Sequence, residues 1–306
     1  MNIKEVCGKL AELVFTVFFV TVLSFLLMRL SPIDPATAYA KRSIGNPSPQ
    51  QIEHIRVQLG FDKPLAVQYA VWIKKVCHFD LGISLTNGKK VWDSIAAALP
   101  KTIAIVFISA CMHIIGITLL SGAVFLSHNT QIYRALQGLC LVGISIPSFY
   151  IAIVYIDFFA VKAGLMSVTG HTDTASYFSP ALCIAVFGIA FYCPLFYKQL
   201  QKESSEDYAF FYRANGVPEY RLFLFHFLPN ASRALIPHFF QNLGLMIANS
   251  TIVERIFSIP GFGYLIVNAV LDRDAPMIHG VIFFLAFIIA CTNIIADTLN
   301  ESMRRI

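Results

Sequence analysis

The sequence predicts an all-α polytopic membrane protein with about six transmembrane helices. The chain has 306 residues, of which 57% are hydrophobic and only 13% charged, and its mean hydropathy is +0.66. Soluble domains carry about 25% charged residues, so this balance is typical of a protein in a bilayer. Several apolar runs also reach the ~20 residues that an α-helix needs to cross ~30 Å of hydrocarbon. The +5 net charge is too diffuse to indicate nucleic-acid binding.

Six apolar runs are each long enough to form one transmembrane helix. They cover residues 10–28, 102–125, 132–160, 180–197, 235–252 and 278–299. The first run is too long for a cleaved signal peptide and lacks a small-residue cleavage site, so we expect it to be retained. The predicted organisation is a tail and first helix in residues 1–31, a separate segment in residues 32–98, and a five-helix core in residues 99–306 with a loop at 199–230.

The segment of residues 32–98 is predicted to be polar and helical. Residues 50–59 have the pattern of a capped amphipathic helix that ends at Gly60. Residues 64–76 predict another helix, whose large apolar residues recur at helical spacing: Leu65, Tyr69 and Trp72.

Basic residues predict the orientation, because short cytoplasmic loops carry an excess of Lys and Arg. Ten lie on the side of both termini: Lys4, Lys9, Arg134, Lys198, Lys202, Arg213, Arg221, Arg233, Arg304 and Arg305. Three lie on the short loops of the other side: Lys162, Arg255 and Arg273. We therefore expect cytoplasmic termini, a cytoplasmic 199–230 loop and an extracytoplasmic 32–98 segment. That segment is basic itself, but long loops cross largely regardless of charge.

Residues 204–230 form a polar and aromatic stretch between two apolar runs. Ser204 and Asp207 predict a capping box at the start of a short helix. The helix is expected to cover residues 208–214 and to stop at Gly216, because glycine suits the left-handed position after a helix.

A second short helix is expected to follow directly. Pro218 suits its first turn, the helix covers residues 219–227, and Pro229 is expected to end it. The two helices carry more apolar area than a hydrated loop needs, and such faces usually mark a partner's groove. The aromatic residues concerned are Phe210, Phe211, Tyr212, Phe223 and Phe225.

This order of features resembles the cytoplasmic coupling loop of ABC importer permeases. The family pattern is a Glu-Ala-Ala-type triad, three residues, a glycine, nine residues and Ile-x-Leu-Pro. Here Gly216 is the glycine and the stretch ends in His226-Phe227-Leu228-Pro229, but the triad is Phe210-Phe211-Tyr212. The peptide/nickel branch has Arg-Ala-Lys-Gly-Leu and then His-x-x-x-Asn. Arg213-Ala214-Asn215-Gly216-Val217, with His226 and Asn230, resembles that version closely.

Further motifs of this family extend the resemblance over almost the whole chain. They are Leu59-Gly60-x-Asp62-x-Pro64-Leu65, Gln68-Tyr69, Trp72, Asp80-Leu81-Gly82-x-Ser84, Ser145-x-Pro147-Ser148-Phe149, Glu254-Arg255-Ile256-Phe257-x-x-Pro260-Gly261-x-Gly263 and Arg273-Asp274-x-Pro276. The resemblance implies that the turn with Glu254, Pro260, Gly261 and Gly263 shapes a periplasmic gate. Pro147 predicts a kink beside the translocation path, although plain structural bending explains a proline equally well.

The resemblance implies a permease subunit in the bacterial inner membrane, belonging to a peptide/nickel-type ABC importer. Its implied partners are a homologous second permease, two ATP-binding-cassette ATPases, an extracytoplasmic binding protein and membrane lipid. The implied ATPase-coupling residues are Phe210, Phe211, Tyr212, Arg213, Ala214, Gly216 and His226. The sequence has no phosphate-binding loop, so ATP must be hydrolysed by the partners, and we expect no catalytic residue or bound cofactor in this chain.

Four ionisable residues lie in or beside apolar runs: His113, Asp157, His238 and Asp297. Such residues at membrane depth are candidates for function, and Asp157 is the one that could meet a cationic substrate. No pair of His or Cys residues has metal-ligand spacing, so no metal site is predicted.

Two other classes of protein remain as alternatives. An ATP-independent secondary transporter or channel predicts inverted repeats, and an intramembrane enzyme predicts a clustered motif such as His-Glu-x-x-His. Neither feature is found in the sequence. Dipeptides, longer peptides, nickel chelates and metal-opine complexes all remain possible substrates, with a lean toward the nickel and dipeptide side.

Overall fold

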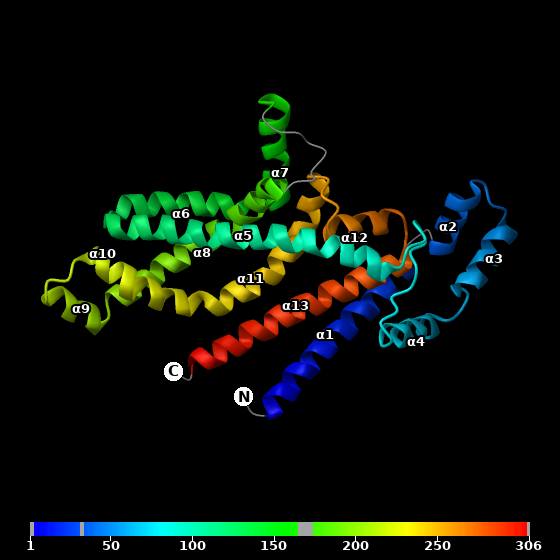
Figure 1. The fold of residues 1–306 in the computed structure, drawn as a ribbon, viewed down its shortest axis with the longest axis horizontal. Coiled ribbons are helices and arrows are strands. Elements are labelled where there is room, and N and C mark those ends of the chain that lie inside the picture. Colours follow the sequence, from blue (N-terminus) through cyan, green and yellow to red (C-terminus); the bar gives the residue numbers. More distant parts are fainter. Residues whose placement is uncertain (1–2, 31–33, 165–173, 305–306) are drawn as a thin grey trace. The chain divides into compact units, whose positions relative to one another are not determined.

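The computed structural model describes residues 3–30, 34–164 and 174–304 (Figure 1). Within these residues the chain is mainly helical and has no β-strand beyond one isolated bridge. The prediction of an all-α protein is therefore confirmed. Residues 31–33, at the start of the predicted extracytoplasmic segment, and Arg305 lie outside the described residues.

The chain forms two compact units. The first comprises Met1–Thr102 and Ile259–Cys291, and the second comprises Ile103–Ser258 and Thr292–Ile306. Two long helices, α5 (Val91–Ser127) and α13 (Ala275–Arg304), contribute residues to both units.

The first unit contains a long N-terminal helix followed by three short ones. Its elements are α1 (Ile3–Arg29), α2 (Pro35–Ile44), α3 (Pro49–Leu59), α4 (Leu65–Val76), α12 (Phe262–Leu271) and the first turns of α5 and α13. The core of this unit forms where a loop meets α5, α12 and α13. It consists of Leu81, Val91, Ile95, Phe262, Ile266, Ala269, Met277, Ile278 and Val281.

The helices predicted at residues 50–59 and 64–76 are confirmed as α3 and α4. Ser48 and Gln51 form a reciprocal capping box at the start of α3. The Ser48 Oγ accepts the Gln51 N–H at 3.3 Å, and the Gln51 side chain accepts the Ser48 N–H at 2.8 Å. The helix ends at Gly60, whose φ of 74° is the left-handed value that glycine adopts easily.

The second unit contains the remaining helices. They are α6 (Thr130–Ser145), α7 (Ser148–Ile156), α8 (Phe178–Ser204), α9 (Asp207–Ala214), α10 (Glu219–Leu222) and α11 (Leu228–Ile256), with π-helical turns at Asp157–Lys162 and Phe223–Phe227 and a 3-10 turn at Thr174–Tyr177. Helix α8 packs against both α6 and α11 (Figure 1). It is therefore the central helix of this unit, and many of its residues are buried.

The kink predicted at Pro147 is confirmed. Helices α6 and α7 form an apolar pair that is bent by 91°. Ile146, between them, has an extended backbone with φ of −100° and ψ of 120°. Proline has no N–H and disfavours helical backbone in the residue before it, so the chain leaves the first helix at Ile146 and starts a new one after Pro147.

Four helices within the described residues are long and apolar enough to cross a membrane. They are Cys7–Met28, Val91–Ser127, Phe178–Ser204 and Ala275–Met303, and the bent α6–α7 pair would make a fifth. These five correspond to predicted runs. The remaining run, residues 235–252, lies within the continuous helix α11, but it is not apolar enough to join them because it contains Gln241, Asn242 and Asn249. The sixth span stays a prediction.

One predicted boundary is wrong. Helix α5 begins at Val91, within the segment predicted to be polar, rather than near residue 102. Pro100 lies inside this helix without ending it. The turns before Pro100 are fixed by tertiary packing, since Val91, Ile95 and Ala98 are buried. Packing of this kind offsets the hydrogen bond that proline removes.

The close approach of α8 to α5 in the second unit gives a testable prediction. A Cβ at Gly188 would lie 2.7 Å from the Cε1 of His113, which is buried and whose Nδ1 lies 3.3 Å from the Asn242 Nδ2. Gly188→Ala should therefore lower the free energy of unfolding by ~1–3 kcal/mol, the usual cost of overpacking. Thermal unfolding in detergent measures the change.

Gly138→Ala is the matched control, because nothing lies within 4 Å of a Cβ at that position in α6. It should leave the unfolding temperature unchanged or raise it slightly, since alanine favours helix by ~0.5–1 kcal/mol over glycine. Equal stability of the two variants would contradict the close packing at Gly188.

Candidate functional site

The segment between α8 and α11 holds the residues predicted to couple to an ATPase. Its first helix, α9, ends in a Schellman motif: the Val217 N–H donates to the Tyr212 carbonyl at 3.1 Å, and the Gly216 N–H donates to the Arg213 carbonyl at 3.0 Å. Gly216 has a φ of 76°, which residues with a Cβ rarely adopt. The predicted stop at Gly216 is confirmed, and Ala214, the last residue of the helix, is exposed.

The predicted capping box at Ser204 is wrong. Helix α8 continues through Ser204, and α9 begins at Asp207 with Glu206 as its N-cap residue and no side-chain cap. Extending an existing helix costs less than starting one, and α8 is already formed upstream by its buried residues. Ser204 instead accepts hydrogen bonds from Arg213, at its Oγ and, at 2.7 Å, at its carbonyl oxygen.

The predicted end of the second helix at Pro229 is also wrong. Helix α10 passes through the π-helical turn Phe223–Phe227 directly into α11. Pro229 lies in the first turn of α11, directly after the π-helical turn, and it removes one backbone donor without ending the helix. The chain therefore runs without a break from α10 into the predicted fifth span.

Arg213 joins three parts of this segment. Its guanidinium makes a bidentate ion pair with Glu219, with Nη2–Oε1 and Nε–Oε2 distances of 2.7 and 3.0 Å. Hydrogen bonds from Arg213 hold the pKa of the Glu219 carboxyl below its usual value. Together with the bonds to Ser204, this pair ties the end of α8 and the end of α9 to the start of α10. The same cation lies 5.6 Å from the ring centroid of Phe227.

The aromatic residues of the segment divide into two groups. Phe210, Phe211 and Phe225 are 76%, 64% and 72% exposed, so they agree with the prediction of an exposed apolar surface. Phe223, which was predicted to be exposed with them, is buried in the core of the unit. Tyr212 is half-buried against that core. Figure 1 shows α9 and α10 together at the end of this unit where α8 stops.

His226 and Asn230 contact two tyrosines of α9. The His226 ring lies 4.6 Å from the Tyr212 ring, and the Asn230 Nδ2 donates to the Tyr208 hydroxyl at 3.4 Å. Tyr208 in turn donates to Glu203 at 2.8 Å. Burial raises the pKa of Tyr208 to about 12, so its hydroxyl keeps the proton that it donates. The His-x-x-x-Asn spacing thus positions the helix that carries Phe210 and Phe211.

The predicted gate residues belong to both units: Glu254 to the second, and Pro260, Gly261 and Gly263 to the first. Glu254 is fully buried in α11. Gly261 is the N-cap residue of α12, and the following N–H, of Phe262, donates to the Thr102 Oγ1 at 2.7 Å. The tight Pro-Gly turn is therefore present, and its role as a gate stays a prediction.

Asp274 brings together two motifs that are far apart in the sequence. This buried residue precedes α13, and its carboxylate accepts the Met277 N–H of the first turn at 3.3 Å. The same carboxylate accepts the Ser84 hydroxyl and the N–H groups of Leu85 and Thr86, the last two at 3.1 and 3.2 Å. One carboxylate thus holds the loop after Asp80-Leu81-Gly82-x-Ser84 onto the start of α13. The sequence showed both motifs but gave no signal that they meet.

Two residues were predicted to line a substrate path. Pro147 lies at the bend between α6 and α7, and Asp157 follows the end of α7. Asp157 begins the π-helical turn after α7, and its carboxylate lies 2.7 Å from the Nζ of Lys162, with both side chains largely exposed. Both residues of this ion pair belong to the same turn. The substrate role of Asp157 and of Pro147 stays a prediction. Among the described residues, no group of three His, Cys, Asp or Glu side chains could hold a metal ion.

Comparison with known protein families assigns the chain. Residues 114–305 match the binding-protein-dependent transport system inner membrane component family, and residues 3–106 match the N-terminal part of such membrane components. The chain belongs to this family. It is a permease of a binding-protein-dependent transport system, and this assignment agrees with the resemblance carried by residues 204–230.

Three relatives show the range of this permease family. A protein of Brucella abortus that is assigned to a peptide transport system as a permease is 32% identical over 300 residues, covering 95% of this chain and 94% of its own. The metal-staphylopine import system permease of Staphylococcus aureus is 27% identical, with 97% and 96% covered. The glutathione transport system permease of Escherichia coli is 30% identical, with 98% and 97% covered. The match thus extends over nearly the full length of each protein.

The Asp274 junction in this permease gives a testable prediction. Asp274→Ala removes the acceptor of the Leu85 N–H and one of the two acceptors of the Thr86 N–H, which also donates to the Ser84 Oγ at 3.2 Å. The loss should cost ~1–3 kcal/mol locally and speed amide exchange in this loop about 10- to 100-fold. Hydrogen–deuterium exchange of the peptide covering residues 82–88 measures it.

Asp272→Ala is the matched control for this experiment. Asp272 is close in sequence, but its hydrogen bonds use its backbone: the carbonyl accepts from Arg42, and the N–H donates to the Asn268 carbonyl at 2.8 Å. The control should leave exchange in residues 82–88 unchanged. Unchanged exchange in Asp274→Ala as well would show that the carboxylate does not hold the loop.

Proposed function

We propose that this permease forms half of the translocation pathway of an ABC importer and converts ATPase motion into uptake. The observation that carries the proposal is the rigidly supported, exposed aromatic surface of Phe210, Phe211 and Phe225. Exposed apolar helix faces of this kind fit a groove on a partner protein. The chain has no nucleotide-binding motif of its own, so ATP is used by two separate ATPase subunits and this subunit is non-catalytic.

The remaining partners follow from the same proposal. A homologous second permease completes the pathway, and an extracytoplasmic binding protein delivers the substrate to the 32–98 side. The chain spans the bacterial inner membrane with both termini in the cytoplasm, in accordance with the distribution of basic residues. The substrate class is a small peptide, nickel or a metal chelate, supported by the peptide, glutathione and metal-staphylopine systems of the relatives.

Coupling works through the supports of α9 and α10. When the ATPases close on ATP, the surface that holds Phe210 and Phe211 moves with them. The Arg213 clamp transmits the displacement to the end of α8, and the unbroken connection from α10 transmits it to α11. Both helices then shift the balance between outward-facing and inward-facing pathways, with the turn at Glu254 and Pro260–Gly263 as the outer gate.

The ATPase contact is tested by replacing the aromatic anchors. In Phe210→Ser/Phe211→Ser the surface loses its largest apolar groups, and buried aromatic anchors each contribute ~2 kcal/mol or more to an interface. We expect the ATPase to be lost from the complex purified in detergent, measured as its molar ratio to this chain.

Phe79→Ser is the matched control, since Phe79 is also highly exposed but lies in the 32–98 segment. It should retain the ATPase at the wild-type ratio. Retention of the ATPase by the double variant, with normal uptake, would contradict the coupling role of the segment.

Asp157 is tested as a pathway residue. If its carboxylate faces the path, Asp157→Asn should raise the KM for a cationic substrate several-fold and leave a neutral substrate unaffected, because only the charge is removed. Lys162→Gln separates this from loss of the Asp157–Lys162 ion pair, which both variants break. Equal effects of the two variants would reduce Asp157 to a structural role.

A further inference from the structure

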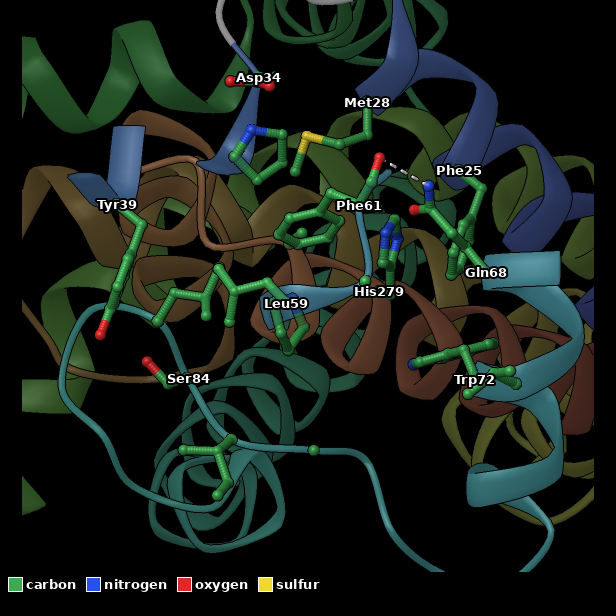
Figure 2. A pocket seen from close by; sticks show the side chains of 18 of the residues that line it. Phe25, Met28, Asp34, Tyr39, Leu59, Phe61, Gln68, Trp72, Ser84 and His279 are labelled. Atoms are coloured by element: carbon green, nitrogen blue, oxygen red, sulfur yellow. Dashed lines mark hydrogen bonds between the residues drawn. The ribbon is translucent and has the colours of Figure 1, made fainter. Parts of the chain in front are cut away.

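An open pocket of about 760 Å³ lies within the first unit, between α1, α2, α4, the 81–88 loop and the start of α13 (Figure 2). Its size is within the range of small-molecule sites, which are mostly apolar with a few placed polar groups. None of the coupling, gate or pathway residues named above lines it. The transport mechanism as proposed therefore leaves the pocket without a role.

Three aromatic rings from different helices make one wall of the pocket. Phe25 of α1 stacks on His279 of α13 with ring centroids 3.7 Å apart, and Trp72 of α4 meets both at 5.4 and 6.0 Å. The Nδ1 of His279 is hydrogen-bonded to the Ser24 Oγ at 2.8 Å, which fixes the ring. This wall is thus formed in advance of any ligand, so binding would not have to order it.

The indole N–H of Trp72 is the feature that points to a ligand. Trp72 is 9% exposed, and its Nε1 is fully buried without a hydrogen-bond partner among the described residues. Figure 2 shows the indole nitrogen on the edge of the ring that faces the interior of the pocket. Indole is a donor only, and buried donors normally have an acceptor. A ligand that fits here carries an acceptor at the depth of Trp72.

Basic residues outnumber acidic ones in the lining of the pocket. Lys63, Lys75 and Arg42 line the pocket, and neither lysine ammonium has an acidic partner among the described residues. Asp34 is the acidic residue in the lining, and it is already paired with Arg56, whose Nε donates to it at 3.0 Å. Burial opposes ionisation of Asp34, but hydrogen bonds from Thr37 and Arg56 outweigh it and lower its pKa. The rim therefore favours an anionic group.

We propose that this pocket binds short amides that end in a carboxylate, such as di- and tripeptides with an apolar C-terminal side chain. The side chain packs on the aromatic wall, a peptide carbonyl accepts the Trp72 N–H, and the carboxylate lies near Lys63 and Lys75. An acyl chain would fill the same wall but would leave the indole N–H without an acceptor. That the bound peptide is imported cargo rests on the transport function proposed above. Binding of the peptide to the pocket is measured without transport.

The chain has two tryptophans, Trp72 and Trp92, so the pocket supplies its own reporter. Trp92→Phe leaves Trp72 as the sole indole, and Trp72→Phe leaves Trp92, which is 44% exposed and does not line the pocket. The full-length chain is purified in detergent and titrated with N-acetyl-Leu-Phe, with its C-terminal amide, and with dodecanoate as the lipid-type probe. Equilibrium dialysis measures ligand binding by variants such as Trp72→Phe, which lack the fluorescent indole in the pocket.

We expect a saturable change in Trp72 emission with the peptide acid, no matching change in Trp92 emission, and about tenfold weaker binding of the amide. Lys63→Gln/Lys75→Gln should reduce the affinity for the acid to that for the amide. Lys74→Gln, a neighbouring exposed lysine that does not line the pocket, should leave the affinity unchanged. Trp72→Phe should weaken binding several-fold in dialysis, because the ring stays apolar but loses its donor.

Three outcomes would overturn the proposal. Equal affinity for acid and amide would exclude recognition of the carboxylate. Binding of dodecanoate in preference to the peptide acid would make this an acyl-chain site. No saturable binding of any probe by fluorescence or dialysis would exclude a ligand of this class. None of these results affects recovery of the ATPase through Phe210 and Phe211, so the binding site and the coupling function fail separately.

Discussion

The need to satisfy backbone N–H and C=O groups away from water governs this structure. In hydrocarbon an unpaired peptide group costs several kcal/mol, so the chain is helical wherever it can be. At several breaks between helices a side chain supplies a missing partner. Thr102 does this for the start of α12, Asp274 for the loop before α5, and Arg213 for the end of α8. Several polar residues with defined contacts are therefore found at the breaks.

The same constraint bears on the coupling role proposed for residues 204–230. A loop held only by solvent would absorb a push from an ATPase, whereas α9 is fixed by the Schellman motif at Gly216, by the Arg213–Glu219 ion pair and by contacts of Tyr208 and Tyr212. Phe210 and Phe211 are exposed on α9, and Phe225 is exposed in the π-helical turn after α10. Phe223 and Phe227 of the same turn are buried in the core of the second unit. One surface is thus left for a partner while its foundation is buried.

The first unit differs from residues 204–230 in that it contains a pocket lined by charged and aromatic residues. Its short helices and loops carry charged groups around an aromatic wall, and the junction at Asp274 fixes one side of that arrangement to α13. A pocket with a preformed apolar wall and an unpartnered donor is suited to holding a small amide with modest affinity. Modest affinity suits the cargo-binding role proposed for this pocket, because slow dissociation of cargo would slow its release.

The sequence by itself determined the class of the protein and most of its helices. Composition and run length sufficed for the membrane assignment, and strong local signals marked the ends at Gly60 and Gly216 and the bend at Pro147. These features depend on a few neighbouring residues, so local rules predict them. Local rules were wrong at Ser204, Pro229 and the start of α5, where packed neighbours extended a helix past its signal. Only the tertiary structure decided that Asp274 meets Ser84, that Phe223 is buried while Phe210 and Phe225 are exposed, and that Trp72 faces a pocket with His279. These contacts join residues far apart in the chain, and which of them form depends on how whole helices pack.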